Sequence, residues 1–248
     1  MDLEYIKRGK QEIIIMNEIH NLELIEPRYE RKFRVDQIAM ADIENMVRLH
    51  SAGFVEAYPL RKVNNIYFDT INMQTYSDNI DGIANSTKFR IRWYGELFGE
   101  IENPVLELKI KRNLAGTKLY YSLKPFTLEP NITLQDIHKA ITDADMPEER
   151  KQQMLMLRPV LLNCYTRKYF ISADRQYRLT LDYDLSYYRI QEMNNSFIHR
   201  NINRRSTIIE LKYPLRLDEC AHKISREFPF RMTKNSKYVT GVQWLYGR

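Results

Sequence analysis

The stretch Lys88-Phe89-Arg90-Ile91-Arg92-Trp93-Tyr94 alternates charged and apolar residues almost one for one. Successive side chains of a β-strand point to opposite faces, so the pattern predicts a strand with one cationic face and one apolar face. The segment Val105-Leu-Glu-Leu-Lys-Ile-Lys-Arg112 repeats it, with Glu107, Lys109 and Lys111 on one side. Two such strands indicate a sheet with one buried face and one charged face.

The same alternation recurs towards both ends of the chain. Near the N-terminus, Glu30, Lys32 and Arg34 share a face, and near the C-terminus Glu210 shares one with Lys212. Strands are predicted at 28–35, 60–69, 87–94, 105–112, 117–123, 163–171, 177–188 and 207–213. The dipeptides Asp81-Gly82 and Ala115-Gly116 predict turns between them.

Helices are predicted between these strands. Asp36 is a candidate N-cap for a helix that ends near Gly53. Three further helical patterns occupy 133–158, 217–227 and 233–246. Residues 1–26 have mixed charge and no clear period, so we expect an N-terminal arm there and one domain over 27–248. About eight strands with few inserted helices predict an α+β fold built on a closed antiparallel β-barrel with peripheral helices.

The composition excludes several classes of protein. The chain has 248 residues, 44% of them hydrophobic, but no apolar run near the roughly 20 residues that a membrane-spanning helix requires. No secretion signal is evident, so we expect a cytoplasmic protein without a membrane segment of its own. Cys164 and Cys220 form no C-x-x-C pair, which argues against a zinc cluster or disulfide framework. The net charge of +6 favours an anionic partner.

The charged strand faces give the most specific signal. Any one of them could be an ordinary solvated face of an antiparallel sheet. Together they contain nine cations, namely Lys32, Arg34, Lys88, Arg90, Arg92, Lys109, Lys111, Arg178 and Lys212. If the barrel closes with these faces inward, neighbouring cations repel by about 1 kcal/mol even in water, so either an occupying anion or compensating carboxylates are expected there. Lysine and arginine suit phosphate oxygens, and the interspersed carboxylates suit Mg²⁺ or Mn²⁺.

Seven segments, in this order and spacing, carry a family resemblance. They are Tyr29-Glu-Arg-Lys-Phe33, Ile66-Tyr-Phe-Asp-Thr70, Lys88-Phe-Arg-Ile-Arg-Trp-Tyr-Gly95, Leu106-Glu-Leu-Lys109, Arg178-Leu-Thr-Leu-Asp-Tyr-Asp184, Ile209-Glu-Leu-Lys212 and Asn235-Ser-Lys-Tyr-Val-Thr-Gly241. With them the chain resembles the VTC domain, the catalytic domain of the vacuolar transporter chaperone polyphosphate polymerases. That domain belongs to the CYTH, or triphosphate tunnel, superfamily.

The resemblance implies roles for individual residues. The implied catalytic set is Lys32, Arg90, Arg92, Lys109 and Arg178. The implied phosphate ligands are those five together with Lys88, Lys111, Arg167, Lys212 and Lys237, the last from a closing helix. Glu210 matches the metal-binding glutamate, with Glu30 and Glu107 as further candidates. The expected cofactor is Mn²⁺ or Mg²⁺.

The resemblance implies a metal-dependent polymerase that transfers the terminal phosphoryl group of ATP to a polyphosphate chain. The first strand has one Glu-x-Lys, where the hydrolase and cyclase branches typically have two glutamates before the lysine, and this argues against thiamine triphosphatase or adenylate cyclase activity. Hydrolysis of tripolyphosphate or an organic triphosphate stays an alternative, as does non-enzymatic polyphosphate binding. Nucleic acid is not expected as a partner, because a duplex cannot reach inward-facing cations. The sequence shows no SPX domain before the tunnel and no membrane segment after it, and leaves a membrane-protein partner open.

Overall fold

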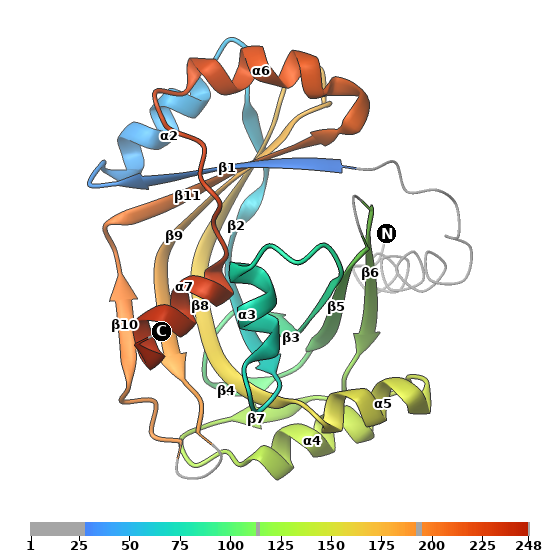
Figure 1. Ribbon diagram of the computed structural model, residues 1–248. Coiled ribbons are helices and arrows are strands. Elements are labelled where there is room, and N and C mark those ends of the chain that lie inside the picture. The colour runs from blue at the N-terminus through green and yellow to red at the C-terminus, as the bar shows by residue number, and fades with distance from the viewer. Residues whose placement is uncertain (1–27, 113–114, 192–194, 248) are drawn as a thin grey trace, which may run out of the picture.

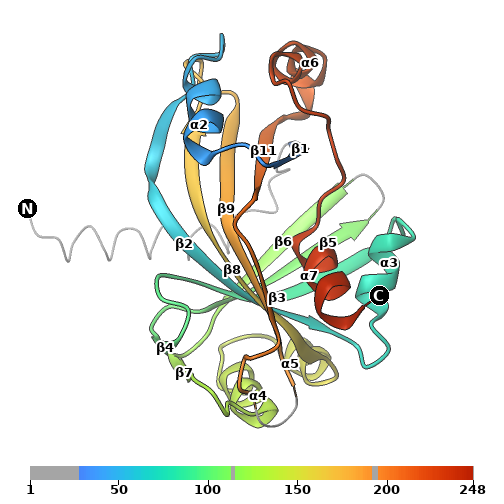
Figure 2. The same ribbon diagram turned by 90° about the vertical axis from the view of Figure 1, so that its left-hand side faces the viewer.

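The structure is a computed structural model that describes residues 28–112, 115–191 and 195–247 (Figure 1). The predicted arm at 1–26 lies outside these residues. In the described part, antiparallel strands dominate, and helices pack on the outside of the sheet and across its opening (Figures 1 and 2). None of the described helices is long and apolar enough to cross a membrane. The combination of an antiparallel sheet with surrounding helices confirms the predicted α+β class.

One large sheet forms the framework. Its strands are β1 (Arg28–Asp36), β2 (Val55–Asp69), β3 (Ser86–Tyr94), β5 (Val105–Arg112), β6 (Ala115–Ser122), β8 (Arg158–Ile171), β9 (Arg178–Arg189), β10 (Arg200–Asn203) and β11 (Ser206–Pro214). Their order is β1-β11-β9-β8-β2-β3-β5-β6, with β10 added beside β9. A separate two-stranded sheet pairs β4 (Gly99–Ile101) with β7 (Phe126–Leu128).

The large sheet is strongly curved, and the half that contains β1 and β11 bends over the half that contains β5 and β6 (Figure 2). Strands β1 and β6 stand at the two ends of the strand order, and no pairing joins them among the described residues. Closure of the barrel by hydrogen bonds therefore stays a prediction. The curvature alone is enough to give the sheet a concave inner face.

Helices cover the sheet at three places. The helices are α2 (Met40–Arg48), α3 (Gln74–Ile80), α4 (Leu134–Thr142), α5 (Glu148–Leu155), α6 (Asp218–Glu227) and α7 (Lys237–Tyr246), and the 3₁₀ turn η1 (Leu215–Leu217) precedes α6. Helices α2 and α6 lie over β1 and β11, α4 and α5 lie at the opposite end, and α7 lies across the opening beside α3 (Figure 1).

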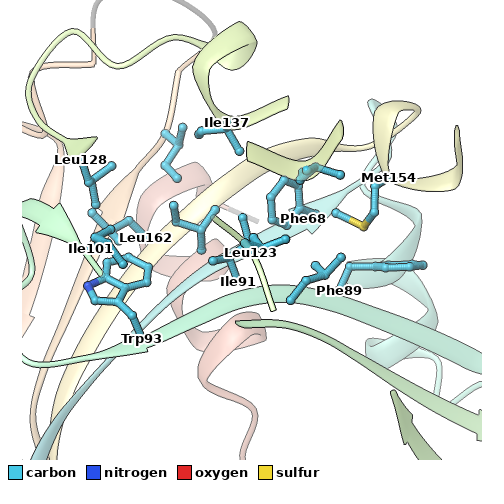
Figure 3. Close-up of a cluster of buried hydrophobic side chains, with 14 of the residues drawn as sticks. Phe68, Phe89, Ile91, Trp93, Ile101, Leu123, Leu128, Ile137, Met154 and Leu162 are labelled. Carbon is cyan, nitrogen blue, oxygen red and sulfur yellow. The ribbon is translucent and has the colours of Figure 1, made fainter. Parts of the chain in front are cut away.

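The apolar strand faces point outward, against these helices. One core cluster contains Phe89, Ile91, Trp93, Leu106 and Leu108 and packs beneath α4 and α5 (Figure 3). A second packs the outer faces of β1, β9 and β11 against α2 and α6. Since apolar and charged residues alternate along β1, β3, β5 and β11, burying the apolar faces of these strands outside turns their charged faces inward.

Two predicted helices differ from those in the structure. Asp36 does not cap a helix: it ends β1, where its carboxylate accepts hydrogen bonds from Arg34, at 3.1 Å, and from Ser206. The chain then turns through Gln37, whose φ is 64°, and α2 begins only after Ala39. The predicted helix at 133–158 is two helices, because Pro147 has no N–H to continue the first and stands at the start of the second.

Two further differences concern the connections. The predicted turn at Ala115-Gly116 is wrong, since both residues belong to β6 and pair with Arg112 and Lys111. Helix α3 was not predicted. It is short, and its first turn is held by Asp69, whose carboxylate accepts hydrogen bonds from the amides of Thr75 at 2.8 Å and Tyr76 at 2.9 Å. A cap supplied from the preceding strand leaves no local sequence signal.

Candidate anion-binding site

Charged side chains from six strands and α7 line a cavity of about 170 Å³ on the concave face. Nine of them are cations, namely Lys32, Lys88, Arg90, Arg92, Lys109, Lys118, Arg167, Lys212 and Lys237. Among the residues that the structure describes, three glutamates, Glu30, Glu107 and Glu210, line the same cavity. The cavity therefore has a large excess of positive charge.

Strand register brings these side chains together. On β1 and β11, Lys32 is paired with Glu210 and Glu30 with Lys212, so the two Glu-x-Lys segments meet in opposite directions. On β3 and β5, Arg90 is paired with Glu107. Residues directly opposite one another on antiparallel strands project to the same face, which explains why acids and bases alternate across the concave surface as well as along each strand.

Glu107 holds two arginines in place. Its Oε2 accepts hydrogen bonds from Nε of Arg90, at 2.8 Å, and from Nη2 of Arg90. Its Oε1 lies 3.1 Å from Nη1 of Arg92, which also donates through Nε to Oδ1 of Asn65 at 3.1 Å. Burial opposes ionisation of Glu107, but the two arginines prevail and lower the pKa of its carboxyl. The arginine pair is thereby oriented before any ligand arrives.

A second, more buried network surrounds Asp182. Its carboxylate accepts hydrogen bonds from Arg167 at 2.5 and 2.6 Å and lies 2.5 Å from Nζ of Lys237. Glu210 lies 3.4 Å from the same ammonium and 3.5 Å from Arg167. Burial would raise the pKa of Glu210, but Lys237, Lys212, Arg167 and Lys32 hold it well below its usual range. The acids stay ionised and keep both cations charged.

Helix α7 brings Lys237 to the cavity because it packs very closely on the sheet. A Cβ added to Gly241 would lie 2.6 Å from side-chain atoms of Leu161 and Tyr187, so only glycine allows this approach. The hydroxyl of Tyr238 also donates to the buried carboxylate of Asp69 at the end of β2. The same carboxylate holds the start of α3, and the two helices are thus fixed together beside the cavity.

The surroundings of two lysines lower the pKa of their ammonium groups. Burial, followed by repulsion from Lys109, Lys32, Arg90 and Lys111, lowers the pKa of Lys88 to about 8. Burial and neighbouring cations lower the pKa of Lys118 to about 8 as well, although its side chain is more exposed. Charged ammonium groups are costly here because the three glutamates are already paired with other cations.

Two predicted phosphate ligands lie outside the cavity lining. Lys111 lines a smaller adjoining pocket of about 160 Å³, which shares Lys88 and Lys109 with the main cavity. Arg178 is exposed at the start of β9, opposite Lys212. The other predicted residues, acidic and basic, all line the cavity.

The sequence reasoning missed several residues of the site. Lys118 follows the period of β6 and could have been found by extending the alternation used for the other strands. Asp182 stands four residues after Arg178 on β9, on the same face by the period of two, but the sequence analysis gave it no role. Tyr165 and Ser236 line the cavity without any sequence signal that separates them from packing or capping residues. Ser236 does cap α7, and its hydroxyl accepts a hydrogen bond from the amide of Val239 at 3.4 Å.

The carboxylates can be tested as metal ligands. Within the described residues, no three His, Cys, Asp or Glu side chains are grouped as a ready metal site. Glu30 and Glu210 nevertheless approach the same two ammonium groups: Lys32 lies 3.4 Å from Glu30 and 3.7 Å from Glu210, and Lys212 lies 3.9 and 3.0 Å from them. Two carboxylates supplemented by phosphate oxygens fit Mg²⁺ or Mn²⁺, which often bind jointly to protein and phosphate.

Comparison with solved structures gives distant similarities. The PH1819 protein from Pyrococcus horikoshii has 13% sequence identity and a TM-score of 0.46, covering 86% of this chain and 97% of that one. A candidate adenylate cyclase from Vibrio parahaemolyticus has 10% identity and a TM-score of 0.49, with 87% and 98% coverage. A Hippeastrum protein with a dominant triphosphatase activity has 14% identity and a TM-score of 0.47, with 89% and 97% coverage.

No curated protein matches the chain. The family comparison, by contrast, is decisive. The model of the VTC domain matches residues 17–246, which is nearly the whole sequence. Each segment that carries the resemblance in the sequence contributes a side chain that lines the cavity or, as Asp182 does with Lys237, holds α7 beside it. The chain therefore belongs to the VTC domain family.

Proposed function

We propose that the protein is a metal-dependent polyphosphate polymerase, which transfers the terminal phosphoryl group of ATP to a polyphosphate chain. The main support is the cavity itself, in which nine cations face three glutamates. Each glutamate is already paired, so the remaining positive charge calls for a multiply charged anion. A chain of phosphates offers one charge or more at each unit and is narrow enough for an enclosed space.

The charged residues of the cavity have two roles in this proposal, positioning of the phosphates and stabilisation of their charge, which are the main requirements of phosphoryl transfer. Arg90 and Arg92, held by Glu107, and Arg167, held by Asp182, present fixed donors to phosphate oxygens. Lys237 closes the cavity from α7, and Lys32 approaches from β1. Such preorganised donors stabilise charge without having to reorient during the reaction.

Glu210 and Glu30 are the proposed ligands of Mg²⁺ or Mn²⁺, since they share the neighbourhood of Lys32 and Lys212. A bound ion would neutralise negative charge on the transferring group. Glu107 contributes to this less directly, because Arg90 and Arg92 hold its two oxygens at 2.8 and 3.1 Å, whereas the cations around Glu210 lie 3.0 to 3.7 Å away. The acceptor is an ionised phosphate, so the reaction needs no general base from the protein.

The decisive experiment incubates the pure protein with ATP and Mn²⁺ or Mg²⁺. Long-chain polyphosphate is followed on a gel, and free phosphate is measured beside it. The polymerase predicts a ladder of chains with little free phosphate, and the ladder should vanish in the Arg90→Ala, Arg92→Ala double variant. Release of phosphate without chains would establish the hydrolase instead. Binding of polyphosphate without either product would leave a non-enzymatic binding protein.

A competition experiment separates both activities from nucleic-acid binding. Tripolyphosphate should displace a bound polyphosphate far better than an RNA of equal total charge, because the cations are gathered inside the cavity. Equal displacement by RNA would mean that an outer surface supplies the binding.

A further inference from the structure

An aromatic and arginine cluster stands beside the cavity on three adjacent strands. The guanidinium carbon of Arg61, on β2, lies 5.3 Å from the ring centre of Tyr94 on β3 and 5.8 Å from that of Tyr169 on β8. Tyr58 packs edge-on against Tyr169, with ring centres 5.9 Å apart and planes at 89°. We call Arg61, Tyr94, Tyr169 and Tyr58 the aromatic rim.

The rim continues the rows of phosphate-binding arginines. Tyr94 follows Arg92 by two residues and Tyr169 follows Arg167 by two, so each tyrosine projects on the same side as its arginine, about 7 Å farther along its strand. Arg61 is paired directly with Arg167 across β2 and β8. Both Arg92 and Arg167 line the cavity. The rim is therefore the next set of side chains that a ligand meets beyond these two arginines.

The exposure of the rim distinguishes it from the buried tyrosines nearby. Tyr94 is 52% exposed and Tyr58 is 60% exposed, whereas Tyr165 and Tyr187, which pack beneath α7, are 3% and 2% exposed. In the described part of the chain, no carboxylate pairs with the Arg61 guanidinium, which is held by the two rings. Open aromatic faces around a guanidinium plane form a surface on which a flat ring can stack.

We propose that the aromatic rim binds the base of a nucleoside triphosphate whose phosphates occupy the cavity. The inference rests on the proposed function and deepens it, because it assigns the place where the base of the nucleotide donor is bound and the stacking that recognises it. The base stacks on the ring of Tyr94 beside the Arg61 guanidinium, which both Tyr94 and Tyr169 contact. Phosphates then run from Arg92 and Arg167 towards Lys32 and Lys237.

The test compares two ligands on the same variants by calorimetry: ATP, which has a base, and tripolyphosphate, which has none. Tyr94→Leu removes the ring but keeps an apolar side chain, and Tyr94→Phe restores the ring without the hydroxyl. Since a base stacked on an aromatic ring gains affinity from the contact, we expect Tyr94→Leu to weaken ATP binding about tenfold. Tyr94→Phe should bind ATP as the unmodified protein does. Both should bind tripolyphosphate normally.

Tyr29→Leu is the control for a generic loss of an exposed tyrosine, because Tyr29 is 38% exposed on the outer face of β1. It should change neither affinity. Unchanged ATP binding in Tyr94→Leu, or equal weakening of ATP and tripolyphosphate, would overturn the proposed base site while leaving the cavity intact. Failure of the unmodified protein to bind tripolyphosphate would instead overturn the proposed function.

Discussion

The replacement Lys88→Arg tests whether the cavity is short of negative charge. Lys88 is half-buried, its Nζ donates to Oδ1 of Asn79 on α3, and burial with repulsion by Lys109, Lys32 and Arg90 lowers its pKa to about 8. A phosphate chain reverses this balance, because it favours the charged ammonium. Anion binding should therefore draw a proton onto Lys88 above pH 8, and the affinity should fall as the pH rises through that value.

The size of the effect follows from the pKa. With a pKa of about 8, the charged fraction of Lys88 in the free protein falls roughly tenfold between pH 7 and pH 9. An arginine stays charged throughout, because its pKa exceeds about 12. The unmodified protein should thus lose about ten times more affinity for tripolyphosphate over this range than Lys88→Arg does. Titration of the ligand and of Lys118 affects both proteins and cancels in the comparison.

The assay is calorimetric titration of tripolyphosphate at pH 7, 8 and 9, in buffers of different ionisation enthalpy so that proton uptake is measured directly. The same linkage applies to folding: the lowered pKa of Lys88 costs stability in full below pH 8, and the cost is relieved as the pH rises towards about 10.4, the value for an unfolded lysine. Equal pH dependence of affinity in Lys88→Arg and the unmodified protein would refute the reasoning, since Lys88 would then be charged in the free cavity at pH 9.

Three further predictions concern the fixed parts of the site. Arg90→Ala with Arg92→Ala should weaken tripolyphosphate binding by about 100-fold or more, through the loss of charge-assisted hydrogen bonds, while circular dichroism shows the fold retained; unchanged affinity would remove both residues from the site. Glu210→Gln should abolish metal-dependent turnover without weakening metal-free tripolyphosphate binding, because it frees Lys237 and Lys212 from a carboxylate; full turnover would exclude Glu210 as a metal ligand. Gly241→Ala should destabilise the protein by about 1–3 kcal/mol in denaturant unfolding, because its Cβ would lie 2.6 Å from Leu161 and Tyr187, whereas Thr240→Ala should cost less; equal stability of the two would mean that α7 can shift freely.

The predicted strands were mostly accurate because their signal is local. A period of two survives in any sheet that buries one face, and the segment 105–112 was predicted with the bounds that it has in the structure. The errors occur where a tertiary contact decides the outcome. The carboxylate of Asp36 accepts a hydrogen bond from Ser206, 170 residues away, and cannot cap a helix. The first turn of α3 is held by Asp69 from the preceding strand.

The residues of the site divide in the same way, into those that a local pattern predicts and those that only tertiary contacts select. The cations of β1, β3, β5 and β11 could be found from alternation alone, since the apolar face of each strand had to be buried. Arg178 obeys the same alternation but lies too close to the start of β9 to line the cavity. Alternation predicts the face of the strand on which a side chain lies. It does not predict whether that position along the strand lies beside the cavity.

By itself, the sequence determined which faces of the strands are charged and which are apolar, because side-chain direction in a strand depends only on the position along it. Only the tertiary structure decided which charges meet. Lys32 and the carbonyl oxygen of Asn235 are 203 residues apart in sequence, yet they lie 3.0 Å apart, because the sheet curves and α7 crosses its opening. The pairing of Lys237 with Asp182 and the lowered pKa of Lys88 depend on that curvature, since burial and repulsion arise from groups that no local pattern brings together.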